Sequence, residues 1–208
     1  MPAFSLAIFD FDGTLADSFP WFCSVLDQTA DKFDLRRVKP EEIESLRDRS
    51  SRDALAYLGV PALKLPAISI FMRKLATDGL DRIPLFPGAA DALRTLHGQG
   101  VRLALVSSNA EENVRHVLAD AAGLIDLYAC GSSLWGKSGK FASVLSALKI
   151  GKSQTIAVGD EIRDIDAARK AGLAVGTVTF GYNSRQALEG AKPDFLFDRY
   201  DEMVAAIG

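Results

Sequence analysis

Two acidic side chains follow an apolar segment near the start of the chain. The run "FSLAIFD" spans residues 4–10 and ends at Asp10; Asp12 comes two positions later, followed by Gly13 and Thr14. Carboxylates this close repel each other, and some would stay protonated without a cation nearby. An Asp-x-Asp pair alone is also common in solvated turns and helix caps, so the rest of the sequence must decide between these interpretations.

Polar residues follow two later apolar segments in the same way. Ser107, Ser108 and Asn109 end the run 101–109, and Asp160 ends the run 154–160, with Asp164 about one helical turn later. If these segments are parallel strands, their carboxyl ends meet at one edge of the sheet. Carboxylates gathered there suit Mg²⁺, which prefers oxygen ligands, and the absence of His and Cys from these motifs argues against zinc.

The hydroxyl and amide groups of residues 107–109 suit phosphate oxygens. The segment "SLWGKSGKF" supplies a lysine, either Lys137 or Lys140, that can screen a nucleophile and hold a phosphate. Lys137 is favoured because apolar residues follow it at helical spacing, whereas Lys140 lies inside the expected helix and is expected to point outward. Each of these pieces alone also fits a helix cap or a surface residue; the combination in this order favours chemistry.

The elements that must position these residues alternate along the chain. Strands are predicted at 4–10, 101–109, 124–131, 154–160, 173–181 and 193–198, and helices at 88–99, 111–123, 140–149 and 161–172. This alternation predicts an α/β fold with a parallel sheet covered on both faces. Residues 18–82 break the pattern, because they hold only helical segments punctuated by prolines, and we interpret them as an all-helical insertion after the first strand.

Composition limits the classes of function. The chain has 208 residues, 48% of them hydrophobic, and a net charge of −3, so nucleic acid is not an expected partner. Its two cysteines, Cys23 and Cys130, are far apart, which favours a reducing cytoplasm over a disulfide framework. There is no evident signal peptide, and no apolar run approaches the roughly 20 residues that span a bilayer, so no membrane partner is expected.

The sequence resembles the haloacid dehalogenase superfamily, and within it the phosphoglycolate-phosphatase-like hydrolases. The motifs "DFDGTLADS", "LVSSN", "GKSGK" and "GDEIRDIDAARKAG" carry this resemblance, in the family's order, over residues 10–172. It implies a Rossmann-like three-layer core formed by residues 1–17 and 83–208. It also implies that the insertion, residues 18–82, is a helical cap domain.

The resemblance also implies roles for the acidic residues. Asp10 would be the nucleophile that forms an aspartyl-phosphate, and Asp12 the general acid and then the general base. Asp10, the backbone carbonyl of Asp12 and Asp160 would ligate Mg²⁺, with Asp164 as a ligand or a support for the ligands. Gly13 and Thr14 would support the loop, where Gly13 permits close backbone approach.

Phosphate binding is implied for the remaining motifs. Ser107, the backbone N–H groups of Ser108 and Asn109, and Lys137 would hold the transferring phosphoryl group. The function implied is a Mg²⁺-dependent phosphatase acting on a small phosphorylated metabolite, with phosphoglycolate as one such substrate. The protein is expected to be a monomer or a homodimer.

Three alternatives stay open. A sugar phosphomutase would keep all four motifs, a 2-haloacid dehalogenase would share Asp10, and a non-catalytic binding protein would keep only the fold. Asp12 favours phosphoryl transfer over carbon–halogen cleavage, because the dehalogenases lack an acid two positions after the nucleophile. Two departures weaken assignment to the true phosphoglycolate enzymes: Ser138 or Phe141 stands where many relatives have proline after the lysine, and Glu161 follows the Gly-Asp pair.

The cap segment offers candidates for substrate choice. Arg47, Arg49 and Arg52 lie within "ESLRDRSSRDALAYLG", and one of them can bind a carboxylate or second phosphate of the substrate. The favoured alternative is a solvated helix face on which these arginines pair with neighbouring acids. Aromatic residues of the segment are expected to form the core of the cap rather than to stack on substrate: Trp21, Phe22 and Phe33.

Overall fold

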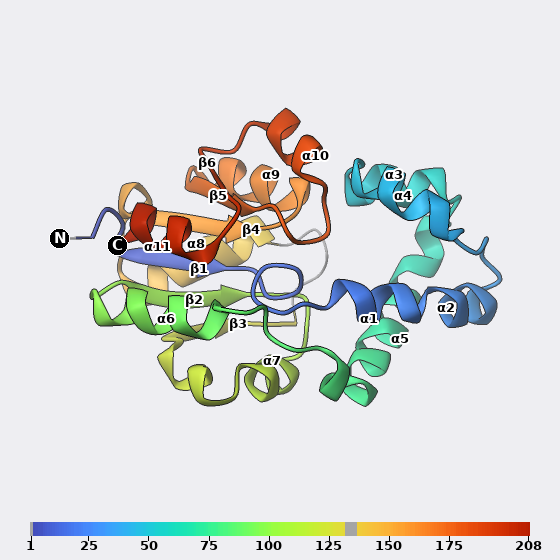
Figure 1. Ribbon diagram of the computed structural model, residues 1–208, viewed down its shortest axis with the longest axis horizontal. Coiled ribbons are helices and arrows are strands. Elements are labelled where there is room, and N and C mark those ends of the chain that lie inside the picture. The colour runs from blue at the N-terminus through green and yellow to red at the C-terminus, as the bar shows by residue number, and fades with distance from the viewer. Residues whose placement is uncertain (1, 132–136) are drawn as a thin grey trace.

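A computed structural model describes residues 2–131 and 137–208. Its centre is a six-stranded sheet in the order β3-β2-β1-β4-β5-β6, and every strand pair is parallel (Figure 1). The strands are β1 (Leu6–Phe9), β2 (Arg102–Val106), β3 (Leu127–Ala129), β4 (Thr155–Gly159), β5 (Ala174–Val178) and β6 (Phe195–Phe197). The predicted α/β class and each of the six predicted strands are therefore confirmed.

Helices cover both faces of the sheet and give the core three layers. Side chains alternate along β1, so that Ala7 and Phe9 pack on one face and Leu6 and Ile8 on the other. The first face is covered by α6 (Ala89–Gly98), α7 (Glu111–Leu118) and α11 (Tyr200–Ile207). The second face is covered by α8 (Lys137–Leu148), α9 (Ile162–Ala171) and α10 (Arg185–Ala191). The Rossmann-like arrangement is as predicted.

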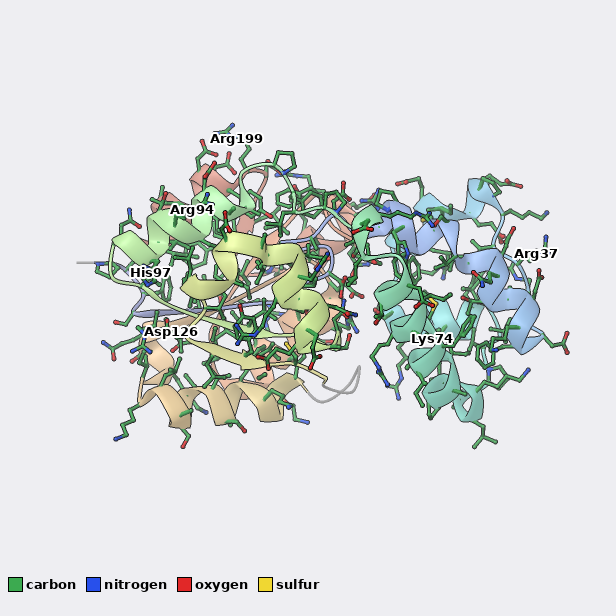
Figure 2. The ribbon with its side chains drawn as sticks, turned by 90° about the horizontal axis from the view of Figure 1, so that it is seen from below. Arg37, Lys74, Arg94, His97, Asp126 and Arg199 are labelled. Atoms are coloured by element: carbon green, nitrogen blue, oxygen red, sulfur yellow. The ribbon has the colours of Figure 1, made fainter. Side chains whose placement is uncertain are left out.

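The insertion contains α1 (Phe19–Ser24), α2 (Leu26–Phe33), α3 (Ile43–Arg47), α4 (Ser51–Tyr57) and α5 (Leu65–Asp78). Short 3₁₀ turns lie between α2 and α3 at Pro40–Glu42, between α4 and α5 at Ala62–Lys64, and after α5 at Leu80–Arg82. Another two lie in the core at Ala119–Leu124 and Lys152–Gln154. We call residues 18–82 the cap; Figure 1 and, in a view turned by 90°, Figure 2 show its helices beyond the carboxyl ends of the strands. The chain enters and leaves the cap side by side, because the Asp17 N–H donates to the Pro84 carbonyl at 2.8 Å.

Two helices and one helix start differ from the sequence prediction. The helices α10 and α11 were not predicted, because segments of 7 and 8 residues show too few turns for a clear periodicity. Helix α8 begins at Lys137, three residues before the predicted start. Residues 132–136 lie outside the described residues.

The two ends of the described chain lie together, on the side of the sheet away from the cap (Figure 1). The Ala3 N–H donates to the Gly208 carbonyl at 3.1 Å, and the Phe4 N–H donates to the Ile207 carbonyl at 3.1 Å. Within the described residues, no single helix has the length and apolar character to cross a membrane. A sharply bent pair, Ser51–Tyr57 with Ala62–Asp78, passes that test on length and composition alone.

Candidate active site

The carboxyl ends of the three central strands bring the predicted motifs together. Phe9 of β1 pairs with Leu105 of β2 and with Val158 of β4, so the residues after these positions share one edge of the sheet. Asp10 extends this pairing, since its backbone N–H donates to the Val158 carbonyl at 2.9 Å. Asp10 and Asp160 are both buried at this edge.

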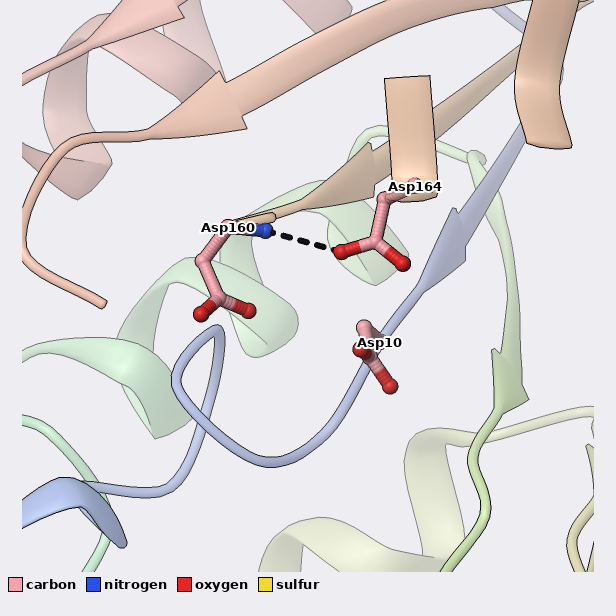
Figure 3. Close-up of side chains that lie close together, drawn as sticks. All are labelled: Asp10, Asp160 and Asp164. Atoms are coloured by element: carbon pink, nitrogen blue, oxygen red, sulfur yellow. Dashed lines mark hydrogen bonds between the residues drawn. The ribbon is translucent and has the colours of Figure 1, made fainter. Parts of the chain in front are cut away.

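Three aspartates form a compact cluster at the edge. One carboxylate oxygen from each of Asp10, Asp160 and Asp164 lies within 4.8 Å of the others (Figure 3). The Asp164 Oδ2 atom accepts hydrogen bonds from the backbone N–H of Asp160 at 3.2 Å and of Glu161 at 3.1 Å, which fixes Asp164 at the start of α9. Asp164 therefore orients the loop that carries Asp160.

Lys137 neutralises part of this cluster. The lysine is the first residue of α8 and is buried; its Nζ donates to Asp10 Oδ2 and, at 2.6 Å, to Asp164 Oδ1. Phe141 and Val144, on the following turns of α8, pack against the sheet and hold the helix start over the site. Of the two candidate lysines, Lys137 is the one that the fold directs into the carboxylate cluster, while Lys140 is only half-buried one turn later.

Asp160 is held from the loop that follows β1. The Thr14 hydroxyl donates to Asp160 Oδ1 at 2.7 Å, and the Tyr182 backbone N–H donates to Oδ2 at 2.8 Å. Gly13 lies against this carboxylate with φ of +78°, and a Cβ there would come within 2.7 Å of Asp160 Cγ and 2.6 Å of the Tyr182 ring. Glycine is therefore required at position 13 by both the backbone conformation and the close approach.

Burial and charge shift the pKa values of the cluster in opposite directions. Burial raises the pKa of Asp10 to about 6, although Lys137 opposes the shift. Burial and the neighbouring acids Glu161 and Asp164 raise the pKa of Asp160 well above its usual value. Burial would also raise the pKa of Asp164, but Lys137 and Arg163 outweigh it and hold that pKa below its usual value.

The cluster fits a divalent cation. Its donors are carboxylate oxygens alone, which is the ligand type that Mg²⁺ takes. Burial raises the pKa values of Asp10 and Asp160 despite the positive side chains nearby, so a further positive charge would stabilise both carboxylates. A bound cation would supply the missing charge, so the residues present are compatible with the predicted Mg²⁺.

Asp12 and the second motif lie beside the cluster. The Asn109 Nδ2 atom donates to Asp12 Oδ2 at 3.3 Å, and burial raises the pKa of Asp12 although hydrogen bonds from Ser18 and Asn109 oppose the shift. The Ser107 hydroxyl accepts from the Asn109 N–H at 3.0 Å, and Asn113 of α7 donates to Asn109 Oδ1 at 3.0 Å. A carboxyl group with a raised pKa can carry a proton at this position.

A cavity of about 790 Å³ lies between this edge and the cap. Its walls include side chains from the core edge and from the cap helices. From the core edge the lining residues are Asp12, Ser108, Asn109, Gly131, Glu161, Arg163 and Tyr182. The predicted phosphate-binding residues Ser108 and Asn109 thus face the space in which a substrate would lie.

Comparison with known proteins agrees with this arrangement. A family model described as "Haloacid dehalogenase-like hydrolase" matches residues 7–178, which include all four motifs. The chain belongs to the haloacid dehalogenase-like hydrolases. The resemblance stated from the sequence is therefore confirmed.

This hydrolase is similar to named relatives and to a separate solved structure. The chain is 31% identical over 203 residues to the phosphoglycolate phosphatase of Synechococcus elongatus, covering 96% of this chain and 95% of that protein. It is 28% identical to the phosphoglycolate phosphatase of Salmonella typhimurium, covering 96% and 91% of the two chains. A haloacid dehalogenase-like hydrolase of Streptococcus pneumoniae shares the fold with a TM-score of 0.80 at 19% identity, covering 98% of each chain.

The cap arginines of this hydrolase fit the favoured sequence interpretation, a solvated helix face, only in part. Arg47 is half-buried, and its guanidinium donates to the carbonyl oxygens of Tyr182 at 3.1 Å and Gly181 at 3.0 Å. Arg47 also pairs with Glu44 at 3.2 Å, as the favoured interpretation expects, but its side chain in addition fastens the cap to the loop after β5. Arg49 and Arg52 are exposed, and Arg49 stacks over the Tyr57 ring at 4.5 Å. The walls described for the cavity include none of the three.

Three residues at the site were not predicted as site residues. Glu161 pairs with Arg163 and accepts a hydrogen bond from Ser51 of the cap, and all of Glu161, Arg163 and Tyr182 line the cavity. Tyr182 follows β5, so the strand-end rule that identified Asp10 and Asp160 also applies to it. Trp21 and Phe22, expected in the core of the cap, pack with the hydrophobic cluster on the first face of the sheet, and both also line the cavity.

Proposed function

We propose that this hydrolase is a Mg²⁺-dependent phosphatase that cleaves a phosphate monoester of low molecular mass through an aspartyl-phosphate on Asp10. The observation that supports it best is the buried cluster of Asp10, Asp160 and Asp164 with Lys137, at the edge that Asp12 and Asn109 also reach. The names of the two relatives, both phosphoglycolate phosphatases, make phosphoglycolate the first ester to test.

In the proposed first step, an oxygen of Asp10 attacks phosphorus, and the bond between phosphorus and the ester oxygen breaks. Asp12 donates a proton to the departing alcohol, a role that suits a carboxyl whose pKa burial has raised. Lys137, whose pKa Asp10 and Asp164 raise against the effect of its burial, remains charged beside the nucleophile. It lowers the repulsion between Asp10 and the incoming phosphate.

In the second step, Asp12 accepts a proton from water, and the water oxygen attacks phosphorus. The bond from phosphorus to Asp10 breaks, which frees the carboxylate and releases inorganic phosphate. Ser107, the N–H groups of Ser108 and Asn109, and Lys137 would hold the phosphoryl oxygens during both steps.

The cation would be held by Asp10, Asp160 and the backbone carbonyl of Asp12, with Asp164 as a further ligand or as the support of Asp160. When bound, Mg²⁺ supplies positive charge to the phosphoryl oxygens and lowers the repulsion among these acids. The cap, residues 18–82, would act as a separate domain that covers the site and excludes water.

The test is release of inorganic phosphate from a panel of phosphate monoesters, with Mg²⁺ and with excess EDTA. Turnover of at least one ester that EDTA abolishes and added Mg²⁺ restores is the expected result. Folded protein that releases no phosphate from any ester would contradict the proposal. Product analysis with a sugar phosphate separates hydrolysis from transfer to a second hydroxyl group.

A further inference from the structure

The cavity at the active site has two chemically different ends. The core end carries the polar residues Asp12, Asn109 and Arg163. The cap end carries mainly aliphatic and aromatic side chains from α1, α2, α4 and α5 and from their connecting loops, among them Trp21, Leu26, Leu35, Leu55, Leu58 and Ile68. One continuous space therefore joins the phosphate-binding edge of the sheet to an apolar wall built by the cap.

The basic side chains that line the cavity do not give its cap end an unpaired charge. Arg36 is already engaged, because its guanidinium donates to both carboxylate oxygens of Glu42 at 2.9 Å. Arg73 belongs to the core end, since it lies one turn of α5 before Thr77, which accepts a hydrogen bond from Asn113 of α7 at 3.0 Å. Arg73 thus adds positive charge on the side of the cavity where a phosphate would lie, and Arg163 on the same side is paired with Glu161.

The polar group of Thr29 at the cap end is also satisfied internally. Its hydroxyl donates to the Val25 carbonyl at 2.9 Å and lies 3.1 Å from Met72 Sδ. A second anionic group of a substrate at this end would lose its hydration against aliphatic side chains, which is costly. An apolar group there would gain free energy by leaving water.

The size of the cavity also favours a large apolar group at the cap end. Its volume of about 790 Å³ falls in the range of about 300–1,000 Å³ that holds drug-sized ligands in proteins. A two-carbon acid such as phosphoglycolate would leave most of this space to water in contact with apolar walls. A substrate with a bulky apolar group would fill it and still present its phosphate to Asp10.

We propose that the preferred substrate is a phosphate monoester whose alcohol part is a bulky apolar group, held against the cap wall while its phosphate lies at the core end. This inference rests on the proposed phosphatase function and narrows its substrate class. The cap then selects by apolar contact area, and the core edge selects only for the phosphate.

The test is a series of straight-chain alkyl phosphates from methyl to octyl, with phosphoglycolate alongside, assayed with Mg²⁺. Burial of each added methylene is expected to raise kcat/KM about fourfold until the wall is covered. If phosphate is released but phosphoglycolate is preferred and the alkyl series is flat, the apolar inference is overturned and the phosphatase function stands. If no ester releases phosphate, both are overturned.

A pair of leucine variants links the effect to the wall. Leu55 is half-buried on α4 and lines the cavity, whereas Leu63 is 96% exposed on the same cap and is absent from the cavity walls described here. In Leu55→Asn the ratio of kcat/KM for octyl phosphate to that for methyl phosphate is expected to fall about tenfold, and in Leu63→Asn it is expected not to change. Because a ratio cancels the fraction of folded enzyme, an equal ratio in wild type and Leu55→Asn would overturn the inference.

Discussion

The core edge and the cap hold their side chains by different means. At the core edge, buried charged groups are tied to one another and to backbone N–H groups, as Asp164 is by Lys137 and by the start of α9. Across the cavity, the cap presents mainly apolar side chains, and its polar groups such as Arg36 and Thr29 bond within the cap. Under the proposed function, this difference assigns the reaction to the core edge and the choice of substrate to the cap.

The largest effect is expected from a change at Asp10, on the core edge. Asp10→Asn removes the charge that Lys137 neutralises and the proposed nucleophile, so kcat is expected to fall by about a thousandfold or more. Asp91→Asn, on the exposed side of α6 where Asp91 pairs with Arg94 at 2.8 Å, is the matched control and is expected to keep the wild-type rate. Initial rates of phosphate release measure both; an Asp10→Asn variant within tenfold of wild type would exclude Asp10 as the nucleophile.

Variants of the two lysines of α8 test which of them acts at the same edge. Lys137→Ala removes the cation that contacts Asp10 and Asp164, and kcat is expected to fall about 10²–10³-fold. Lys140→Ala, one turn later on α8, is expected to leave kcat within about twofold. Steady-state kinetics measure kcat for both variants, and circular dichroism checks that both are folded. Near-normal turnover by Lys137→Ala beside an inactive Lys140→Ala would reverse the assignment.

Gly13 tests how tightly the core edge is packed. Gly13→Ala places a Cβ against Asp160 and Tyr182 at a positive φ, so kcat is expected to fall about 10–100-fold and the free energy of unfolding by about 1–3 kcal/mol. In Gly98→Ala the new Cβ meets nothing within 4 Å at the end of α6, and a gain of about 0.5–1 kcal/mol is expected. Urea unfolding and activity assays measure both. A Gly13→Ala protein with wild-type activity would show that the loop can move aside.

The smallest effect is expected where the cap meets the core. Arg47→Ala leaves the carbonyls of Gly181 and Tyr182 without this donor, and the free energy of unfolding is expected to fall by about 1 kcal/mol. Arg52→Ala, at an exposed site on α4, is expected to change it by less than about 0.5 kcal/mol. Thermal unfolding of the two variants compares them. Equal stabilities would mean that the Arg47 contact does not hold the cap to the core.

The strand-end residues were predictable because their signals are local. An apolar run that stops at Asp10 or Asp160 marks both a buried strand and the point at which a polar group emerges. Lys137 was predictable for a related reason, since the apolar spacing after it sets the face of α8 that packs on the sheet.

The contacts between cap and core were not predictable in the same way. Arg47 bonds to residues more than 130 positions away, and its acidic neighbours in sequence suggested an ordinary solvated helix. The cavity also has no local signal, because Leu55 and Trp21 show the same apolar spacing whether they fill a core or face a hollow. The volume of a cavity depends on the distances between helices, and the order of residues along one helix does not determine those distances.

The neighbouring ends of the chain have a practical consequence for engineering. Because Ala3 and Gly208 are hydrogen-bonded to each other on the side away from the cap, a short linker can join them without crossing the active site. New ends opened at Gly59, in the loop after α4, would give a circular permutant that retains every strand of the sheet. A tether to a solid support next to Ala3 or Gly208 would likewise lie on the side of the core away from the cap.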